Sequence, residues 1–331
     1  MDRRTALAAL GLTGAGLLGR RLAATKANQA SVNSRGTLMQ GITDSSRDKL
    51  RGMLNRPGFS GQIPADEVDL LVKSEATTVD ALMVELLPVA RTYSRPPLSS
   101  FQVGAVVRGT SGSLYLGANI EIPGHALGLT VHAEQAALSN AYMHNDQGIA
   151  AIAVTAAPCG HCRQFMNELS PEGEIQVLLG SNTPTKLSSL LPMAFGPKNL
   201  GLKHGAFPVN LVELTLPNGA SDVVADAALV AARGSYAPYT KAHSGIAIGT
   251  KQGRVYKGSY LENAAFNPSL SPFQAALVAL TLAGENSSGV FRVVLIEVEG
   301  ASISQKSVTE AALGAVAPGV KLQLLTATRR A

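Results

Sequence analysis

The second half of this 331-residue chain repeats the first. Seven residues of the first half recur 141 positions later, and nearly all are turn or packing types: Ser94, Pro97, Gly104, Gly112, Tyr115, Gly117 and Glu121 recur as Ser235, Pro238, Gly245, Gly253, Tyr256, Gly258 and Glu262. After a shortening by two residues, the segment Gln-Ala-Ala-Leu at 135–138 recurs at 274–277. A duplicated fold keeps the residues that set its turns and its close contacts. The repeat therefore predicts two domains of the same architecture.

Strand-like and helix-like patterns alternate within the first copy. Apolar runs at 102–107 and 113–120 flank a Gly-rich turn and predict a hairpin, and further strands are predicted at 148–156 and 176–179. Helical patterns cover residues 66–72, 78–87, 131–144 and 158–169, and Pro88 should end or kink the second of them. This alternation predicts an α/β fold, a three-layer α/β/α sandwich with a mixed sheet of about five strands. The sandwich should occur twice, after a small N-terminal helical segment.

The net charge of +5 belongs to the first 47 residues, which carry seven basic and two acidic side chains. The remainder holds equal numbers of each sign, and this neutrality argues against a nucleic-acid partner. The uncharged run at 6–19 is too short to span a bilayer, and no later segment reaches that length uninterrupted, so no membrane partner is expected. The leader is rich in Arg, Ala, Leu and Ser and poor in acids, as transit peptides are. Arg3-Arg4 could also begin a bacterial twin-arginine export signal. We expect a cytoplasmic protein, or a plastid or mitochondrial one if the leader is a transit peptide.

The only two cysteines lie in one short motif. Cys159 and Cys162 form Pro-Cys-Gly-His-Cys, downstream of His132-Ala133-Glu134. One imidazole and two thiolates supply three ligands to one tetrahedral zinc ion per chain and leave the fourth corner for water. Glu134 is close enough in sequence to carry a proton beside that water. His-x-Glu followed by Pro-Cys-x-x-Cys is the signature of zinc deaminases.

The second copy lacks this chemistry. Ser271 stands at the position of His132 and Phe273 at that of Glu134, and the second half contains no cysteine. We therefore expect five parts: a basic presequence or disordered leader at 1–47, a helical segment at 48–78, a catalytic domain at 79–180, a linker at 181–220 and a non-catalytic copy at 221–331.

From about residue 48 to the C-terminus, the chain resembles the two-domain, dimeric cytidine deaminases of the bacterial and plant type. The resemblance is carried by Phe-Gln-Val-Gly-Ala at 101–105, Gly-Ala-Asn-Ile-Glu at 117–121, Val-His-Ala-Glu-Gln at 131–135, the segment 157–169, Leu-Leu-Pro at 190–192, Ala-Phe-Gly-Pro at 194–197 and Glu-Asn-Ala-Ala-Phe-Asn-Pro at 262–268. It implies zinc-dependent hydrolysis of cytidine and deoxycytidine to uridine and deoxyuridine, with release of ammonia, in pyrimidine salvage. It also implies a homodimer with sites at the subunit interface.

The resemblance assigns roles to individual residues. Glu134 would take a proton from water, pass it to the ring N3 and later protonate the departing amine. Asn119 and Glu121 would bind the ribose 3′-hydroxyl, which an amide and a carboxylate can do together. The recurrence of Glu121 as Glu262 leaves a structural role open. Further contacts are implied for Phe101, which would stack on the base, for the backbone of Ala133, and for Phe195, which would reach the site from the partner subunit.

Two other interpretations share the cysteine motif. Cys159 and Cys162 could serve a thiol-disulfide oxidoreductase, although such domains usually place an aromatic residue where this chain has Pro158. A deaminase of another nucleoside or of nucleic acid would have the same metal ligands, but the neutral body favours a free nucleoside. His161 as a fourth ligand would close the site to water, so we expect that it does not bind the metal.

Overall fold

The computed structural model describes residues 39, 41–169, 174–180, 183–217, 219–220 and 222–329. Residues 1–38 and 40 of the predicted leader lie outside the described residues. Helix α2 (Asp44–Leu54) begins inside the predicted 1–47 leader, because Thr43 starts the helix early and its hydroxyl accepts a hydrogen bond from the Ser46 amide.

The first half is built on a six-stranded mixed sheet in the order β1-β3-β2-β4-β5-β6. Its strands are β1 (Gln62–Ile63), β2 (Gly104–Gly109), β3 (Leu114–Ala118), β4 (Ile149–Val154), β5 (Gln176–Leu179) and β6 (Thr185–Lys186). Only β4 and β5 run parallel, and the predicted hairpin is the antiparallel pair β2–β3. The expectation of about five strands was one too few here, because two-residue strands at both edges are too short to leave a pattern in the sequence.

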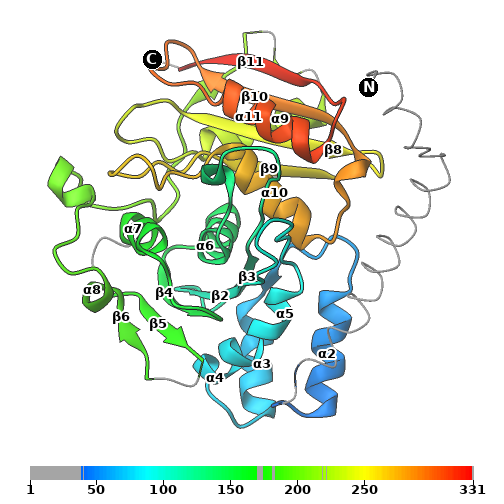
Figure 1. Cartoon of the computed structure of the whole chain (residues 1–331), viewed down its shortest axis with the longest axis vertical. Coiled ribbons are helices and arrows are strands. Elements are labelled where there is room, and N and C mark those ends of the chain that lie inside the picture. The colour runs from blue at the N-terminus through cyan, green and yellow to red at the C-terminus, as the bar shows by residue number, and fades with distance from the viewer. Residues whose placement is uncertain are drawn as a thin grey trace, which may run out of the picture.

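Helices cover both faces of this sheet (Figure 1). They are α3 (Ala65–Ser74), α4 (Val79–Glu85), α5 (Leu87–Arg91), α6 (Ala133–Met143), α7 (Gly160–Leu169) and α8 (Leu187–Leu190), with a 3₁₀ turn η2 (Leu127–Leu129). Pro88 ends the predicted helix at 78–87: α4 stops at Glu85, and Pro88 lies in the first turn of α5, where its missing N–H costs nothing.

The second half repeats this plan with a five-stranded mixed sheet in the order β7-β11-β10-β8-β9, in which only β10 and β11 run parallel. Its elements are β7 (Leu214–Thr215), α9 (Val223–Arg233), β8 (Ser244–Thr250), β9 (Val255–Ser259), α10 (Pro272–Leu282), η4 (Ser287–Gly289), β10 (Val290–Val298), α11 (Lys306–Val316) and β11 (Leu322–Arg329). The predicted linker at 181–220 holds β6, α8, η3 (Pro197–Leu200) and β7. Two similar mixed α/β units confirm the predicted fold class.

The repeated glycines explain how the helices pack so closely on the sheets. A Cβ on Gly104 would lie 2.6 Å from the backbone of α5, and one on Gly117 would lie 2.2 Å from the backbone of α6 on the opposite face. The equivalent glycines, Gly245 and Gly258, would meet α9 and α10 at 2.1 and 2.3 Å. Any side chain at these four positions would push a helix away from its sheet.

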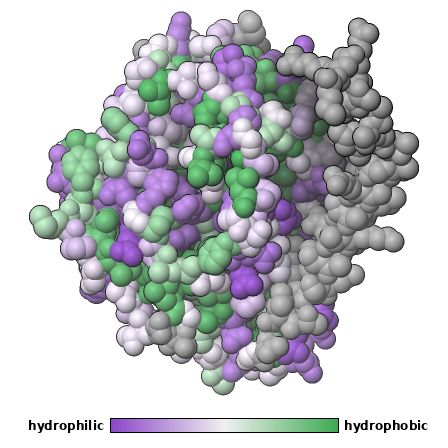
Figure 2. Space-filling view, viewed as in Figure 1, coloured by the Kyte–Doolittle hydropathy of each residue, from purple (hydrophilic) through white to green (hydrophobic). Residues whose placement is uncertain are grey.

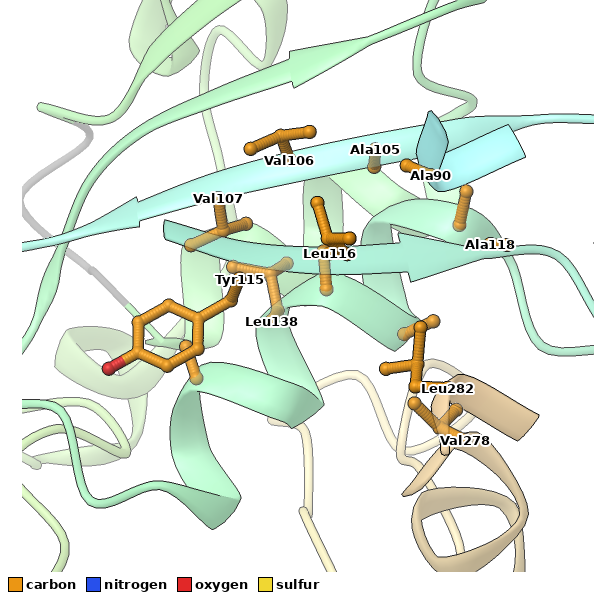
Figure 3. Close-up of a cluster of buried hydrophobic side chains, with 14 of the residues drawn as sticks. Ala90, Ala105, Val106, Val107, Tyr115, Leu116, Ala118, Leu138, Val278 and Leu282 are labelled. Carbon is orange, nitrogen blue, oxygen red and sulfur yellow. The ribbon is translucent and has the colours of Figure 1, made fainter. Parts of the chain in front are cut away.

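The two halves share one hydrophobic core. Helices α6 and α10, which are equivalent in the repeat, pack against each other between the two sheets. Figure 3 shows Leu116 and Leu138 of the first half beside Val278 and Leu282 of the second, and all four are buried. A smaller core lies between α9 and the outer face of the second sheet. The two halves therefore pack into a single body and are not independent domains joined by a linker.

On the face drawn in Figure 2, hydrophobic residues lie in small groups among hydrophilic ones. Within the described part of the chain, every helix is too short or too polar to cross a bilayer.

Candidate active site

Three metal-binding side chains converge where helices α6 and α7 begin. His132 is the residue that precedes α6, Cys159 precedes α7, and Cys162 lies in the first turn of α7. The His132 Nδ1 atom lies 3.4 Å from Cys159 Sγ and 3.3 Å from Cys162 Sγ, and the three donor atoms all lie within 4.8 Å of one another. A tetrahedral zinc ion bound to one nitrogen and two sulfurs would separate nitrogen from sulfur by about 3.6 Å. The donor set and its spacing therefore fit zinc.

The two thiols differ in their readiness to ionise. A hydrogen bond from the Cys162 thiol lowers the pKa of Cys159 to about 4, with help from the backbone amides of Cys162 and His161 at the start of α7. The same hydrogen bond, together with burial, raises the pKa of Cys162. The pair thus readily carries one negative charge, and a thiolate is the form of cysteine that binds metal.

His161 lies beside this cluster but points elsewhere. Its Nε2 atom lies 3.3 Å from the Asn267 carbonyl oxygen in the second half, and its ring meets that of His132 edge-on at 6.1 Å. Among the described residues, the donor cluster consists of His132, Cys159 and Cys162. The protein therefore provides three ligands at this site.

Glu134 is buried next to the metal ligands. It lies in the first turn of α6, is only 5% exposed, and its carboxyl group contacts the Cys162 thiol. Burial raises the pKa of this carboxyl above its ordinary value. A buried carboxyl group with a raised pKa is suited to accept a proton and to give it back.

A cavity of about 260 Å³ opens from the metal ligands to the surface. It is lined by Ser99, Phe101, Val103, Asn119, Glu121, Thr130, His132, Ala133, Glu134, Ala156, Ala157 and Cys159. Of the nine predicted site residues, this cavity brings seven together. Cys162, which is buried and contacts His132, and Phe195 are not among the lining residues.

The Asn119 side chain holds the segment of the cavity wall that contains Phe101 and Val103. The Asn119 Oδ1 atom accepts hydrogen bonds from the Val103 amide, at 2.9 Å, and from the Ser94 hydroxyl. Its Nδ2 atom donates to the Phe101 carbonyl at 2.9 Å. These three bonds leave one amide hydrogen of Asn119 for another acceptor.

Glu121 holds the loop at the mouth of the cavity. Its carboxylate accepts hydrogen bonds from the Leu98 amide, at 2.7 Å, and from the amide and hydroxyl of Ser99. Burial acts to raise the pKa of Glu121, but these hydrogen bonds outweigh it and hold the pKa below its ordinary value.

The same arrangement recurs 141 residues later. Glu262 accepts hydrogen bonds from the Tyr239 amide at 2.8 Å and from the amide and hydroxyl of Thr240. Because the second copy lacks the metal ligands, this carboxylate must be retained there for the loop. Ser99 is thus a further site residue that was not predicted, although its recurrence as another hydroxyl residue, Thr240, is visible in the sequence.

The two phenylalanines occupy different places. Phe101 lines the cavity and is 62% exposed. Phe195 is 46% exposed, and its carbonyl accepts hydrogen bonds from the Gln164 and Asn167 side chains of α7 at 2.7 and 3.2 Å. Phe195 therefore lies near the metal-binding helix but outside the cavity of its own chain.

Comparison with known proteins agrees with this geometry. A family model described as "Cytidine and deoxycytidylate deaminase zinc-binding region" matches residues 77–177, and a second model with the same description matches residues 187–310. The cytidine deaminase of Vibrio vulnificus is 43% identical over 268 residues, which cover 81% of this chain and 90% of that protein. This chain belongs to the cytidine deaminase family.

Other members of the family give the same result. The cytidine deaminase of Serratia proteamaculans is 42% identical over 81% of this chain and 90% of its own length. That of Vibrio atlanticus is 41% identical over 89% of this chain and 99% of its own length. The second match falls on the copy that has Ser271 and Phe273 in place of a ligand and an acid, so it reflects the retained deaminase fold. A redox role for the cysteine pair is not favoured, since it would leave His132 and Glu134 without a purpose.

Proposed function

We propose that this protein is a zinc-dependent hydrolase that converts cytidine and deoxycytidine to uridine and deoxyuridine in pyrimidine salvage, with release of ammonia. The observation that carries the proposal is the cluster of His132, Cys159 and Cys162 with Glu134 buried beside it. Zinc bound to such a set lowers the pKa of a water molecule to about 7 and so supplies a nucleophile at neutral pH.

Glu134 moves the protons of the reaction. It accepts a proton from the attacking water, delivers it to N3 of the cytosine ring, and takes a second proton from the hydroxyl on C4 to the departing amine. Ammonia leaves and the uracil carbonyl remains. Its burial supports this role, because a carboxyl group with a raised pKa can exist in both protonation states during one turnover.

The cavity residues would bind the nucleoside. Phe101 would stack on the base, and the backbone of Ala133 would contact its edge. The ribose 3′-hydroxyl would accept from the free amide hydrogen of Asn119 and donate to Glu121. Glu121 has acceptor capacity to spare, since a carboxylate offers about four acceptor sites and the loop uses three.

A second copy of the chain would complete the site. The exposed Phe195, tied to α7 but outside its own cavity, supports the proposal that it reaches the cavity of a partner in a homodimer. The enzyme would act in the cytoplasm, or in a plastid or mitochondrion if residues 1–47 are a transit peptide. Mixing inactive Glu134→Ala with inactive Phe195→Ala subunits should restore part of the activity if sites are shared, and should restore none if each chain is self-sufficient.

The direct test measures cytidine turnover and zinc content together for the wild type and Glu134→Ala. We expect about one zinc ion per chain in both proteins, with turnover only in the wild type. Unchanged turnover in Glu134→Ala would remove its assigned role. A metal-free wild type with a reversible Cys159–Cys162 disulfide would support the redox interpretation instead.

A further inference from the structure

One face of the metal-binding helix α7 is bound to the second half of the chain. His161, Gln164 and Glu168 are spaced by three and four residues, so they lie on the same side of the helix. Cys162 and Met166, which face away from this stripe, are buried. Cys162 of α7 and Cys159, which directly precedes α7, have a role in the proposed function, whereas this polar stripe has none.

Glu168 makes the shortest hydrogen bonds between this face of α7 and the second half of the chain. Its carboxyl group is fully buried, and it accepts hydrogen bonds from the hydroxyls of Tyr236, at 2.9 Å, and Tyr239, at 2.6 Å. The Ala264 amide donates a third bond at 2.8 Å. All three donors belong to the second half, whereas Glu168 belongs to the first. Three donors hold this carboxyl group tightly in place, because a buried acidic group without hydrogen-bond partners would cost free energy of folding.

The other two residues of the stripe bind the loop at 262–270. The Gln164 carbonyl accepts from Asn263 Nδ2 at 3.2 Å, and the Gln164 Nε2 atom donates to Asn263 Oδ1 at 3.4 Å. His161 Nε2 lies 3.3 Å from the Asn267 carbonyl. Helix α7 is therefore held along its length, from its metal-binding start to Glu168.

The tyrosines that bind Glu168 are specific to the second copy. In the repeat, Tyr236 corresponds to Arg95 and Tyr239 to Leu98, neither of which carries a phenol. Tyr239 is also held in place from its own side, because Glu262 accepts a hydrogen bond from its amide. These two hydroxyls are thus not a by-product of the duplicated fold.

We propose that Glu168 is a positioning residue of the metal site. Through Glu168, the second half of the chain fixes helix α7, which contains Cys162 and begins directly after Cys159. The inference rests on the metal site of the proposed function. Glu168 is six residues from Cys162, about 9 Å along the helix, so a tilt or shift of α7 at Glu168 displaces both sulfur atoms relative to His132. Metal affinity depends on how firmly the ligands are held. Loss of a group that hydrogen-bonds a ligand directly typically weakens binding 10- to 100-fold, and a contact that acts through the helix should have a smaller effect.

The test compares Tyr236→Phe/Tyr239→Phe with Tyr256→Phe in the full-length protein. The double variant removes only the two hydroxyls that bind Glu168. The control removes a tyrosine–carboxyl hydrogen bond of the same kind, from Tyr256 to Glu285 at 3.1 Å, that does not involve α7. The primary measurement is the zinc dissociation constant from competition with a chromogenic chelator, with thermal unfolding of the zinc-free proteins as the measure of general stability.

We expect the double variant to bind zinc several-fold more weakly than the wild type, by up to about tenfold, and Tyr256→Phe to bind it with unchanged affinity. Equal zinc affinity in the wild type and the double variant would overturn the inference, as would an equal loss in the control. If the double variant does not fold, Tyr239→Phe alone decides: weaker zinc binding supports the inference and unchanged binding overturns it. A wild type that binds no zinc would contradict the proposed function itself.

Discussion

Glu121 supports a loop in addition to the sugar contact that is proposed for it. In both copies the equivalent residue binds the backbone and hydroxyl of the same loop, although only the first copy has metal ligands. Support of this loop is therefore common to both copies, whereas the sugar contact proposed for Glu121 would be specific to the first copy. Glu134 has no such counterpart, since its equivalent in the second copy is Phe273, and this difference fits the purely chemical role proposed for Glu134.

The position of the Glu134 carboxyl should matter more than its charge. Glu134→Asp keeps the carboxylate but withdraws it by one methylene group from the cavity. We expect turnover to fall by at least about 100-fold, the usual contribution of a positioned general acid or base. Zinc content should stay near the wild-type value, because the three ligands are untouched. Near-normal turnover of cytidine in steady-state assays would contradict this geometry.

His243 should make the stability of the protein depend on pH. Burial, together with the charges of Arg329 and Lys241, lowers the pKa of His243 to about 4 in the folded protein. An unfolded histidine titrates near 6.5, so the unfolded state binds the proton first as the pH falls. The stabilising effect is thus complete above pH 6.5 and is lost as the pH drops toward 4.

We expect the free energy of unfolding to fall by on the order of 2–3 kcal/mol more across this range in the wild type than in His243→Gln. Urea unfolding at several pH values measures the difference, in which the carboxyl groups common to both proteins cancel. Parallel pH profiles for the two proteins would show that His243 has no such effect.

At the scale of elements, the close packing of α6 on the sheet sets the position of His132 and Glu134. Gly117→Ala would place a methyl group 2.2 Å from the backbone of α6, so the helix must move outward. Overpacking of this kind costs about 1–3 kcal/mol. We expect a lower melting temperature and weaker zinc binding, because His132 directly precedes α6.

Gly314→Ala is the matched control for that substitution. Gly314 lies within α11, and an added Cβ there meets no atom within 4 Å. Alanine should stabilise the helix by about 0.5–1 kcal/mol and leave zinc binding unchanged. The account of α6 would be wrong if thermal melts and zinc titrations showed the same small effect for both substitutions.

At the scale of the whole molecule, the second half of the chain supports the metal site of the first half, because the two halves share one hydrophobic core. Leu282 of α10 is buried against the first half, in the cluster that holds Leu138 of α6 (Figure 3). Leu282→Ala should lower the free energy of unfolding by about 2–5 kcal/mol. Loss of helical signal and release of zinc should remain coincident during unfolding, since one core serves both halves. Two separate transitions in the wild type would contradict a common core.

Much of this molecule could be predicted from the sequence, because its strongest signals are local or periodic. The repeat predicted the duplicated fold, and the spacing of His132, Cys159 and Cys162 predicted the metal cluster. The edge strands β1 and β6 could not be predicted, since two residues carry no pattern and their pairing depends on distant chain segments. The contact of Glu168 with two tyrosines some 70 residues away was missed for the same reason. It arises only when the two halves dock.

The zinc K-edge X-ray absorption spectrum of the zinc-loaded protein identifies the atoms bound to the metal. An open site made by one imidazole and two thiolates predicts one nitrogen at about 2.0–2.1 Å, two sulfurs at about 2.3 Å and one further light atom from solvent. A fit that requires a second imidazole or a third sulfur would show a site closed by protein ligands and would contradict the catalytic account.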